Sequence, residues 1–306
     1  MQGRGAGEPA STGRLSERTR TLCALVSVAV LATAAPTLLV HDILNGPAVM
    51  NGSARGTALT MLVLALPTLW CGLLIAGRDP VRGRALVVGA LAYVVYNATL
   101  FVFATPFNSL FLLDVALLGL ALWTLVSSLV DPLPRLQPGP ALPVRTIVVF
   151  ILAVVALNAT AWLMFVIPDL AQDPPGFLDG TGLTTNPIYV QDLAVWLPAL
   201  TIAAVLLWRR HPVGVVLAGS GLVFWLVEAI GVAVDQWFGH QADPASDVAT
   251  LAGAVMFVVL AAATAVPLAW WWRTATRDLQ TRPSDWACPY CRDRAQRHRA
   301  GHVVPK

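Results

Sequence analysis

Residues 144–167 read VRTIVVFILAVVALNATAWLMFVI, and this stretch decides the fold class. Arg145 is its only charged residue. At a rise of about 1.5 Å per residue, a helix of this length crosses the ~30 Å hydrocarbon core of a bilayer. No water is present at that depth to satisfy backbone amides, so the segment must be helical. The sequence therefore predicts an all-α membrane protein.

The whole chain has the composition of a transmembrane helical bundle of about eight spans. Its 306 residues are 57% hydrophobic and only 12% charged, and the mean hydropathy is +0.68. Soluble domains carry about 25% charged residues. The transmembrane domain is expected at 21–272, between basic tails at 1–20 and 273–306. The predicted spans lie near 21–42, 57–76, 85–105, 108–130, 144–167, 189–208, 213–237 and 247–272.

The distribution of arginine predicts the orientation of the spans. With eight spans, both tails and the second, fourth and sixth connections share one side, and they hold nearly all the basic residues. The opposite side has Arg55 alone, together with several aspartates. Lys and Arg accumulate in cytoplasmic loops. The sequence therefore predicts a multi-pass plasma-membrane protein with both termini cytoplasmic, and the Arg-rich, Ala-rich composition indicates a GC-rich bacterial genome.

The two ends of the predicted domain carry further signals. Trp270, Trp271 and Trp272, followed by Arg273, are expected to anchor the last span at the inner membrane interface. The first span, with small residues at 32–34, also resembles a secretory signal whose cleavage would leave the other spans oriented as before. The basic residues form no patch interleaved with aromatic residues. We therefore expect the lipid bilayer, and no nucleic acid, as a partner.

Two pairs of spans repeat the same polar pattern. Asn97-Ala98-Thr99 and Asn158-Ala159-Thr160 occur in the third and fifth spans. The fourth and sixth spans then begin with Asn108 and Asn186, each followed six residues later by an aspartate and then by an aliphatic residue and Ala. An even number of spans separates the copies, so a duplicated two-helix hairpin would be a parallel repeat. The alternative is that Asn and Pro match only because both cap helix ends.

Polar residues are expected in the outer half of the membrane. Asn97, Asn158 and Glu228 lie about 12–14 Å below the predicted outer surface, and Asp114 and Asp192 about 5–9 Å below it. The inner half has few such groups. If the protein has a binding site, we expect it in the outer half.

Glu228 is the sharpest candidate, because an intramembrane carboxylate is costly and must face protein or water. Gly231 and Asp235 follow it at i+3 and i+7 on the same helical face. This stripe predicts a cavity open to the outside. The other reading is that the Asn residues join helices and the Asp residues favour helix N-termini. The candidate binding residues are Glu228, Asp235, Asp114, Asp192, Asn97, Asn158 and Tyr93.

The C-terminal tail contains a Cys-x2-Cys pair, Cys288 and Cys291, with the letters of a glutaredoxin-type redox motif. About thirty residues are too few for the thioredoxin fold in which such a pair works. His298 and His302 follow and suit a zinc site, although the central gap is shorter than in zinc fingers. The alternative is a basic tail near anionic lipid. No other cofactor is expected.

Two stretches carry a family resemblance. Residues 93–123, YVVYNATLFVFATPFNSLFLLDVALLGLALW, and residues 185–214, TNPIYVQDLAVWLPALTIAAVLLWRRHPVG, cover about a fifth of the chain. They resemble segments of a family of polytopic bacterial integral membrane proteins. That family has no assigned activity, so the resemblance implies a membrane fold and supplies no function.

The sequence contains no phosphate-binding Gly-rich loop, no His-Glu-x-x-His, no nucleophile elbow and no kinase signature, so an enzyme is not expected. The preferred hypothesis is a transporter or permease-like protein that takes a proton, a small cation or a small solute at Glu228. The alternative is a non-catalytic scaffold or accessory subunit. A membrane enzyme using Glu228, Asp235 and Asp114 on a lipid-linked substrate ranks last, because it lacks a His or Ser partner.

Overall fold

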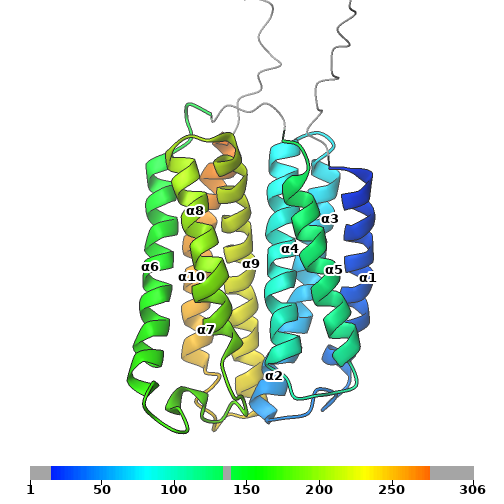
Figure 1. Ribbon diagram of the computed structural model, residues 1–306, viewed down its shortest axis with the longest axis vertical. Coiled ribbons are helices and arrows are strands. Elements are labelled where there is room, and N and C mark those ends of the chain that lie inside the picture. Colours follow the sequence, from blue (N-terminus) through cyan, green and yellow to red (C-terminus); the bar gives the residue numbers. More distant parts are fainter. Residues whose placement is uncertain (1–14, 134–138, 276–306) are drawn as a thin grey trace, which may run out of the picture. The chain divides into compact units, whose positions relative to one another are not determined.

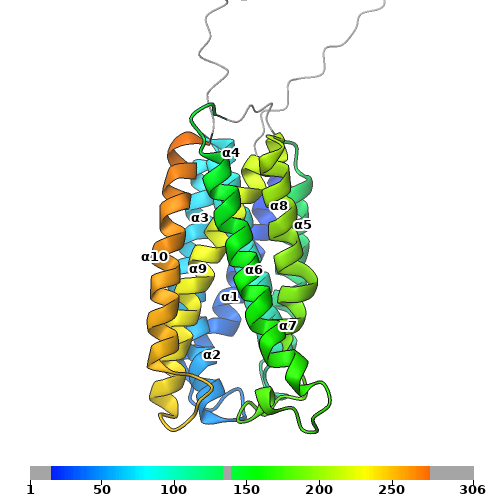
Figure 2. The same cartoon turned by 90° about the vertical axis from the view of Figure 1, so that its left-hand side faces the viewer.

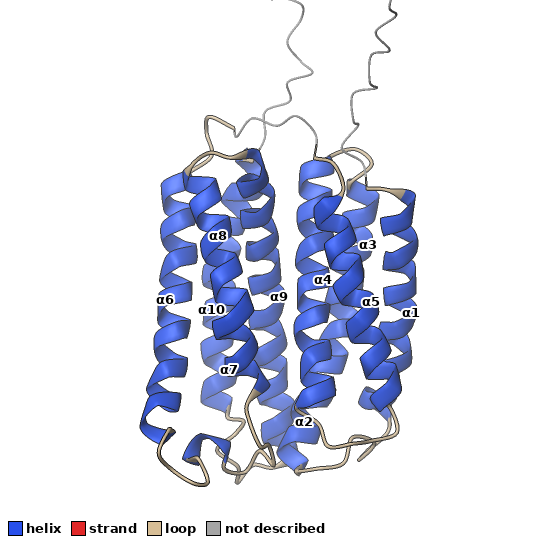
Figure 3. Ribbon diagram, in the orientation of Figure 1, coloured by secondary structure: helices blue, strands red, loops and turns tan. Residues whose placement is uncertain are grey.

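The computed structural model describes residues 15–133 and 139–275, and in these parts of the chain the regular structure is entirely helical (Figure 3). Two of the spans contain a π-helical segment, and the fifth connection, at 170–186, includes a short 3₁₀ turn. The elements are α1 (Glu17–Leu39), α2 (Ala48–Thr60), η1 (Met61–Ala65), α3 (Leu66–Ile75), α4 (Pro80–Phe103), α5 (Phe111–Val130), α6 (Val144–Asp169), η2 (Gly176–Leu178), α7 (Pro187–Gln191), η3 (Asp192–Trp196), α8 (Leu197–Trp208), α9 (Pro212–Ala242) and α10 (Leu251–Thr274).

Eight helices of the described residues are long and apolar enough to cross a membrane. The second span joins α2, η1 and α3, and the sixth joins α7, η3 and α8. Large apolar side chains are exposed along many of these helices, as lipid-facing surfaces require. The chain is therefore an all-α, multi-pass membrane protein, and this prediction from the sequence is confirmed.

The spans form two groups that lie side by side in Figure 1. The N-terminal group holds α1, α2–α3, α4 and α5, and the C-terminal group holds α6, α7–α8, α9 and α10 (Figures 1 and 2). Helices α4 and α9 pack together between the groups, and α2 also packs along α9. Accordingly α4 and α9 are the most buried spans, with 72% and 67% of their most apolar stretches buried, against 17% in α6 and 22% in α10.

Successive spans run in opposite directions, so their connections fall at two ends. One end holds the connections 40–47, 104–110, 170–186 and 243–250, and we call it the acidic end because Asp173, Asp179 and Asp243 lie there. The other holds 76–79, 209–211 and the described parts of 131–143, and we call it the basic end because it carries Arg78 and Arg209.

The second span begins at Ala48, well before the predicted start at residue 57. Gly52 and Gly56 lie in this added part of the helix, where they let α2 approach α9 closely. A Cβ on Gly52 would lie 2.6 Å from the Phe238 carbonyl oxygen, and a Cβ on Gly56 would lie 2.8 Å from the Asp235 Cα. Small residues here therefore serve helix packing.

Other predicted ends also shift. Arg55, expected in a connection, lies within α2 and donates from Nε to the Leu38 carbonyl oxygen at 3.1 Å. The seventh span continues past the predicted residue 237 to Ala242. The eighth begins at Leu251 rather than at 247, because the Thr250 side chain caps the helix there. Apolar composition locates each span but not the turns of helix that extend beyond its apolar part.

The second and sixth spans share a local construction that no sequence pattern had suggested. In each, a five-residue π-helical segment is followed by Leu-Pro, at Leu66-Pro67 and Leu197-Pro198. The Leu66 N–H donates to the Met61 carbonyl, and the Leu197 N–H to the Asp192 carbonyl, which is the wide i to i−5 pattern. Proline lacks the N–H that a regular helix needs, so the helix of each of these two spans widens just before the proline.

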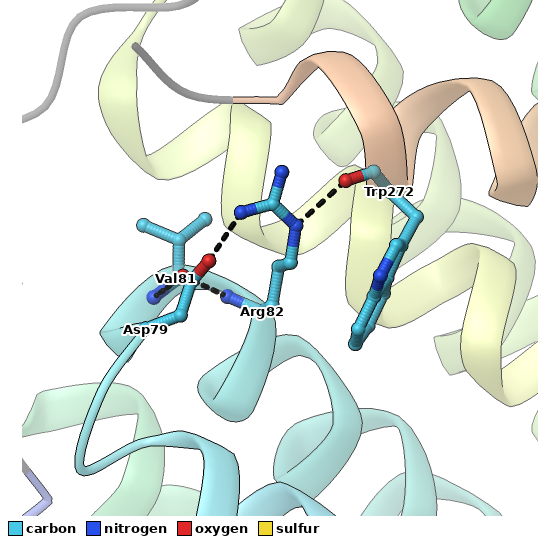
Figure 4. Close-up of polar contacts among 4 residues, drawn as sticks. All are labelled: Asp79, Val81, Arg82 and Trp272. Atoms are coloured by element: carbon cyan, nitrogen blue, oxygen red, sulfur yellow. Dashed lines mark hydrogen bonds and ion pairs between the residues drawn. The ribbon is translucent and has the colours of Figure 1, made fainter. Parts of the chain in front are cut away.

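The basic end joins the start of α4 to the end of α10 (Figure 4). The Asp79 carboxylate caps α4 by accepting from the backbone N–H groups of Val81 and Arg82 at 3.2 and 3.0 Å, and it also pairs with the Arg82 guanidinium. Arg82 Nε donates to the Trp272 carbonyl oxygen at 2.6 Å, and the guanidinium lies 5.8 Å from the centre of the Trp272 ring. One arginine thus ties two distant spans.

The expectation of an interfacial anchor is wrong for Trp271. Its side chain is fully buried, and Nε1 donates to the Val215 carbonyl oxygen at 2.8 Å. The ring packs against Gly219, where an added Cβ would lie 2.2 Å from it. Trp270, by contrast, is 42% exposed. The helical periodicity turns neighbouring tryptophans to different faces, so one of them packs inside the C-terminal group.

Candidate functional site

A cavity of about 1040 Å³ lies mainly within the C-terminal group. Its walls come from α2, α4, α6, α7 with η3, α9 and α10. The connections 170–186 and 243–250 also contribute to its lining, so it reaches the acidic end. Helices α6 and α10 touch each other only sparsely, which leaves room between them for this volume.

The cavity is lined by carboxylates and by no Lys, Arg or His of the described residues. Glu228 stands near the middle of α9, sixteen residues after Pro212 and fourteen before Ala242. The helical rise therefore places it about 21 Å from the end of the helix. The expected depth of 12–14 Å below the membrane surface stays a prediction, because α9 continues past its apolar stretch. The carboxylates of the lining belong to Asp179, Asp192, Glu228, Asp235, Asp243 and Asp247.

Glu228 is held from the neighbouring central helix. Asn97 Nδ2 on α4 donates to Glu228 Oε2 at 3.1 Å and to the Tyr93 carbonyl oxygen at 3.1 Å. The Asn97 side chain is 2% exposed, so this amide is fixed between the two helices. The structure thus brings together two of the predicted residues, and the same contact also joins α4 to α9.

Asp235 is held by α2. Thr57 Oγ1 donates to Asp235 Oδ1 at 2.9 Å, and Ser53 Oγ donates to the Asp235 carbonyl oxygen at 3.3 Å. Ser53 and Thr57 are four residues apart and so lie on one face of α2. Sequence reasoning missed both, because the start of α2 was taken for a connection.

Tyr93 is buried behind the cavity rather than in its lining. Its hydroxyl lies against Gly231, where an added Cβ would be only 2.8 Å from that oxygen. Gly231 stands between Glu228 and Asp235 on α9, so the missing side chain makes room for the tyrosine. Tyr93 therefore supports the acidic stripe from behind.

Asp192 faces the cavity from the first residue of η3. Its Oδ2 accepts from Trp162 Nε1 at 2.8 Å, and the Tyr96 hydroxyl is a second hydrogen-bond partner of the carboxylate. The Trp162 and Tyr189 ring centres are 4.5 Å apart, and Phe177 is 5.5 Å from Tyr189. These three rings form an aromatic wall beside the carboxylate. We had not predicted this wall, because single aromatic residues in apolar spans give no signal.

The remaining candidates lie in different places. Asn158 lines the cavity, and its Oδ1 has no partner in the described parts of the chain. Asp114 lies on α5 in the N-terminal group, 1% exposed, and it does not line the cavity. Neither of its carboxylate oxygens has a partner among the residues that the structure describes. The cavity therefore gathers Glu228, Asp235, Asp192 and Asn158, with Asn97 touching Glu228.

The matching asparagines of the two predicted hairpin copies make similar local hydrogen bonds. Asn108 Oδ1 accepts from the Leu110 N–H at 2.8 Å, and Asn186 Oδ1 accepts from the Ile188 N–H at 3.0 Å. Asn186 is the N-cap of α7, whereas Asn108 lies two residues before Leu110, the N-cap of α5, so capping explains only one of the two asparagines. The duplicated hairpin stays a prediction.

Comparisons with protein-family models, with curated proteins and with solved structures found no match. The resemblance of residues 93–123 and 185–214 therefore identifies no family, and the polytopic helical membrane fold is what stands.

Metal ligands are not assembled in the described residues, where no group of three or more His, Cys, Asp or Glu side chains could hold a metal ion. The tail residues Cys288, Cys291, His298 and His302 lie outside the described residues, so zinc binding there stays a prediction.

Proposed function

We propose that this chain is a transporter or permease-like protein that takes a cation into the acidic cavity. The observation that carries the proposal is a cavity of about 1040 Å³ that reaches Glu228 near the middle of α9, with Asp235 and Asp192 along it and no basic residue in its lining. Ionisable side chains within membrane spans mark substrate and ion pathways, and transporter sites lie near the bilayer midplane.

We place the protein in a bacterial plasma membrane with both termini cytoplasmic and the cavity open to the outside. The support is the gathering of arginines at the basic end, where Arg78, Arg82, Arg145, Arg209 and Arg210 all lie. Labelling from one side of the membrane tests this orientation. In the variant Asp179→Cys, the introduced thiol should react with a membrane-impermeant maleimide in intact cells. A reaction only after lysis would reverse the orientation.

Proton flux into proteoliposomes tests the transport proposal. Purified protein is reconstituted, a potassium diffusion potential is imposed with valinomycin, and internal pH is followed with a trapped dye. Glu228→Gln should abolish the pH-dependent flux while the protein stays folded. The matched control is Asp114→Asn, a buried acid outside the cavity, which should keep the flux. Equal flux in both variants would contradict a transport role for Glu228.

A second candidate is a non-catalytic scaffold or accessory subunit, in which the acids only hold helices together. The hydrogen bonds from Asn97 to Glu228 and from Thr57 to Asp235 favour it, since each joins two spans. In that case Glu228→Gln alters thermal stability in detergent and leaves any flux unchanged. Under either proposal the chain is not an enzyme.

A further inference from the structure

A ligand of this cavity must match both the charge and the size of the cavity. All the charged side chains of the lining are carboxylates, so an anion is repelled and a cation is favoured. About 1040 Å³ is the size of pockets that hold drug-sized molecules rather than bare ions. The carboxylates are also dispersed, since Glu228 and Asp235 are about 10 Å apart along α9. No metal-binding group of three is found among the described residues.

The aromatic wall adds a second preference. The Trp162 and Phe177 rings both pack on Tyr189 at the cavity, and Trp162 Nε1 is bonded to Asp192. A carboxylate fixed beside aromatic faces is the pattern that recognises organic ammonium groups, through charge attraction and cation–π contact. Phe165, Phe257 and Leu260 of the sparsely packed α6 and α10 give the cavity an apolar side as well. An amphipathic cation matches this lining.

An unpartnered polar atom indicates the kind of cationic head. Asp192 is 2% exposed, and its carboxylate is held by Trp162 Nε1 and by the Tyr96 hydroxyl. Asn158 Oδ1, also in the lining, is unpartnered in the described parts of the chain. A buried acceptor that lacks a donor carries a desolvation cost, and a ligand that brings N–H groups removes it. Asn158 therefore favours a donor-bearing head.

We infer that the cavity binds an organic cation with an aromatic body and an N–H-bearing head, such as a protonated primary amine or a guanidinium. The head pairs with Asp192 and Glu228, and the aromatic body lies against Trp162 and Tyr189. This names the substrate class of the proposed transport site and so rests on that proposal for movement, but binding is measurable without movement.

Three matched probes test the inference by equilibrium dialysis against the full-length protein in detergent. They are 2-naphthylethylammonium, its N,N,N-trimethyl analogue, which keeps the charge and lacks N–H donors, and 2-naphthylethanol, which lacks the charge. The ammonium probe should bind at least about tenfold more tightly than either analogue, since hydrogen bonds to charged groups contribute roughly that factor or more. Equal binding of the alcohol would show an apolar cavity only and overturn the inference. Equal binding of the trimethyl analogue would overturn the donor-bearing head.

Substitutions in the cavity lining test where the ammonium probe binds. Asp192→Asn should weaken the ammonium probe by about tenfold. Phe177→Leu, which removes one ring of the wall and no charge, should weaken it by a smaller factor and serves if Asp192→Asn fails to fold. Asp42→Asn at the acidic end, outside the cavity lining, is the control and should bind as the parent does. Unchanged binding in both cavity variants would overturn the inference.

The two proposals fail separately. Proton flux that depends on Glu228, without binding of the ammonium probe, overturns the organic cation and leaves the transport proposal standing. Binding that depends on Asp192, without any flux of protons or of the probe in proteoliposomes, supports the site and overturns transport.

Discussion

The hydrogen bond from Thr57 to Asp235 offers a sharp test of the packing between α2 and α9. Thr57→Val keeps the shape and the β-branch of the side chain and removes only the hydroxyl. Thr57 is 5% exposed, so no solvent replaces the lost donor on its own side. Its Oγ1 lies 2.9 Å from Asp235 Oδ1, so the substitution breaks a well-formed bond between two spans.

The size of the expected loss in the free energy of unfolding depends on the hydrogen-bond acceptor, the Asp235 carboxylate. Polar bonds between membrane helices average about 0.6 kcal/mol and reach about 1.7 kcal/mol. A carboxylate acceptor places this one near the upper limit, because bonds to charged groups are stronger. Asp235 also lines the cavity, so it keeps access to water there and avoids the full cost of burial. We expect Thr57→Val to lower the free energy of unfolding by about 1.5 kcal/mol.

Unfolding of the protein in mixed micelles, by titration with sodium dodecyl sulfate and followed by circular dichroism, measures this difference. Thr124→Val is the matched control: Thr124 is fully buried, and among the described residues its hydroxyl bonds only to the Leu120 carbonyl oxygen of its own helix. It should change the free energy of unfolding much less. If the two variants agree within about 0.3 kcal/mol, the α2–α9 bond does not contribute and the reasoning is refuted.

Three other substitutions test neighbouring features by the same unfolding measurement. Asp114→Leu should raise the free energy of unfolding by about 1–3 kcal/mol, because it replaces a buried carboxyl whose oxygens have no partner in the described chain; a loss would reveal a missed partner. Gly231→Ala should cost about 1–3 kcal/mol by pressing on the Tyr93 hydroxyl, and Tyr93→Phe in the same chain should recover part of that loss, whereas no recovery would place the strain elsewhere. Trp271→Phe should cost about 1 kcal/mol by removing the bond to Val215, while Trp270→Phe, at a half-exposed position, should leave stability unchanged.

The number of spans was predictable because an apolar stretch of about twenty residues leaves few alternatives to a membrane helix. Their ends were less predictable. Gly52 and Gly56 are typical of loops in isolation, and only contact with α9 explains why they continue a helix. Trp271 shows the same limit, since its burial depends on the position of Gly219 in another span.

The acidic stripe was predictable and its surroundings were not. Glu228 and Asp235 stand seven residues apart, so helical periodicity alone places them on one face. Nothing local links Trp162 to Asp192 or Thr57 to Asp235, because these pairs come from different spans. Asp114 matches Asp192 in sequence context, yet the structure puts it in the other group of helices and away from the cavity.

The π-helical segment η3 fixes the direction in which its acidic residue points. A π segment accommodates one extra residue in the helix, and one residue corresponds to a rotation of about 100°. If the same residues were wound as a regular α-helix, the part of the span before η3 would be turned by about that angle relative to α8. Asp192 would then leave Trp162 and point toward lipid or a neighbouring helix. The wide turn before Pro198 thus sets the rotation of the preceding turn about the helix axis. It determines the direction of the Asp192 carboxylate without changing the rest of the span.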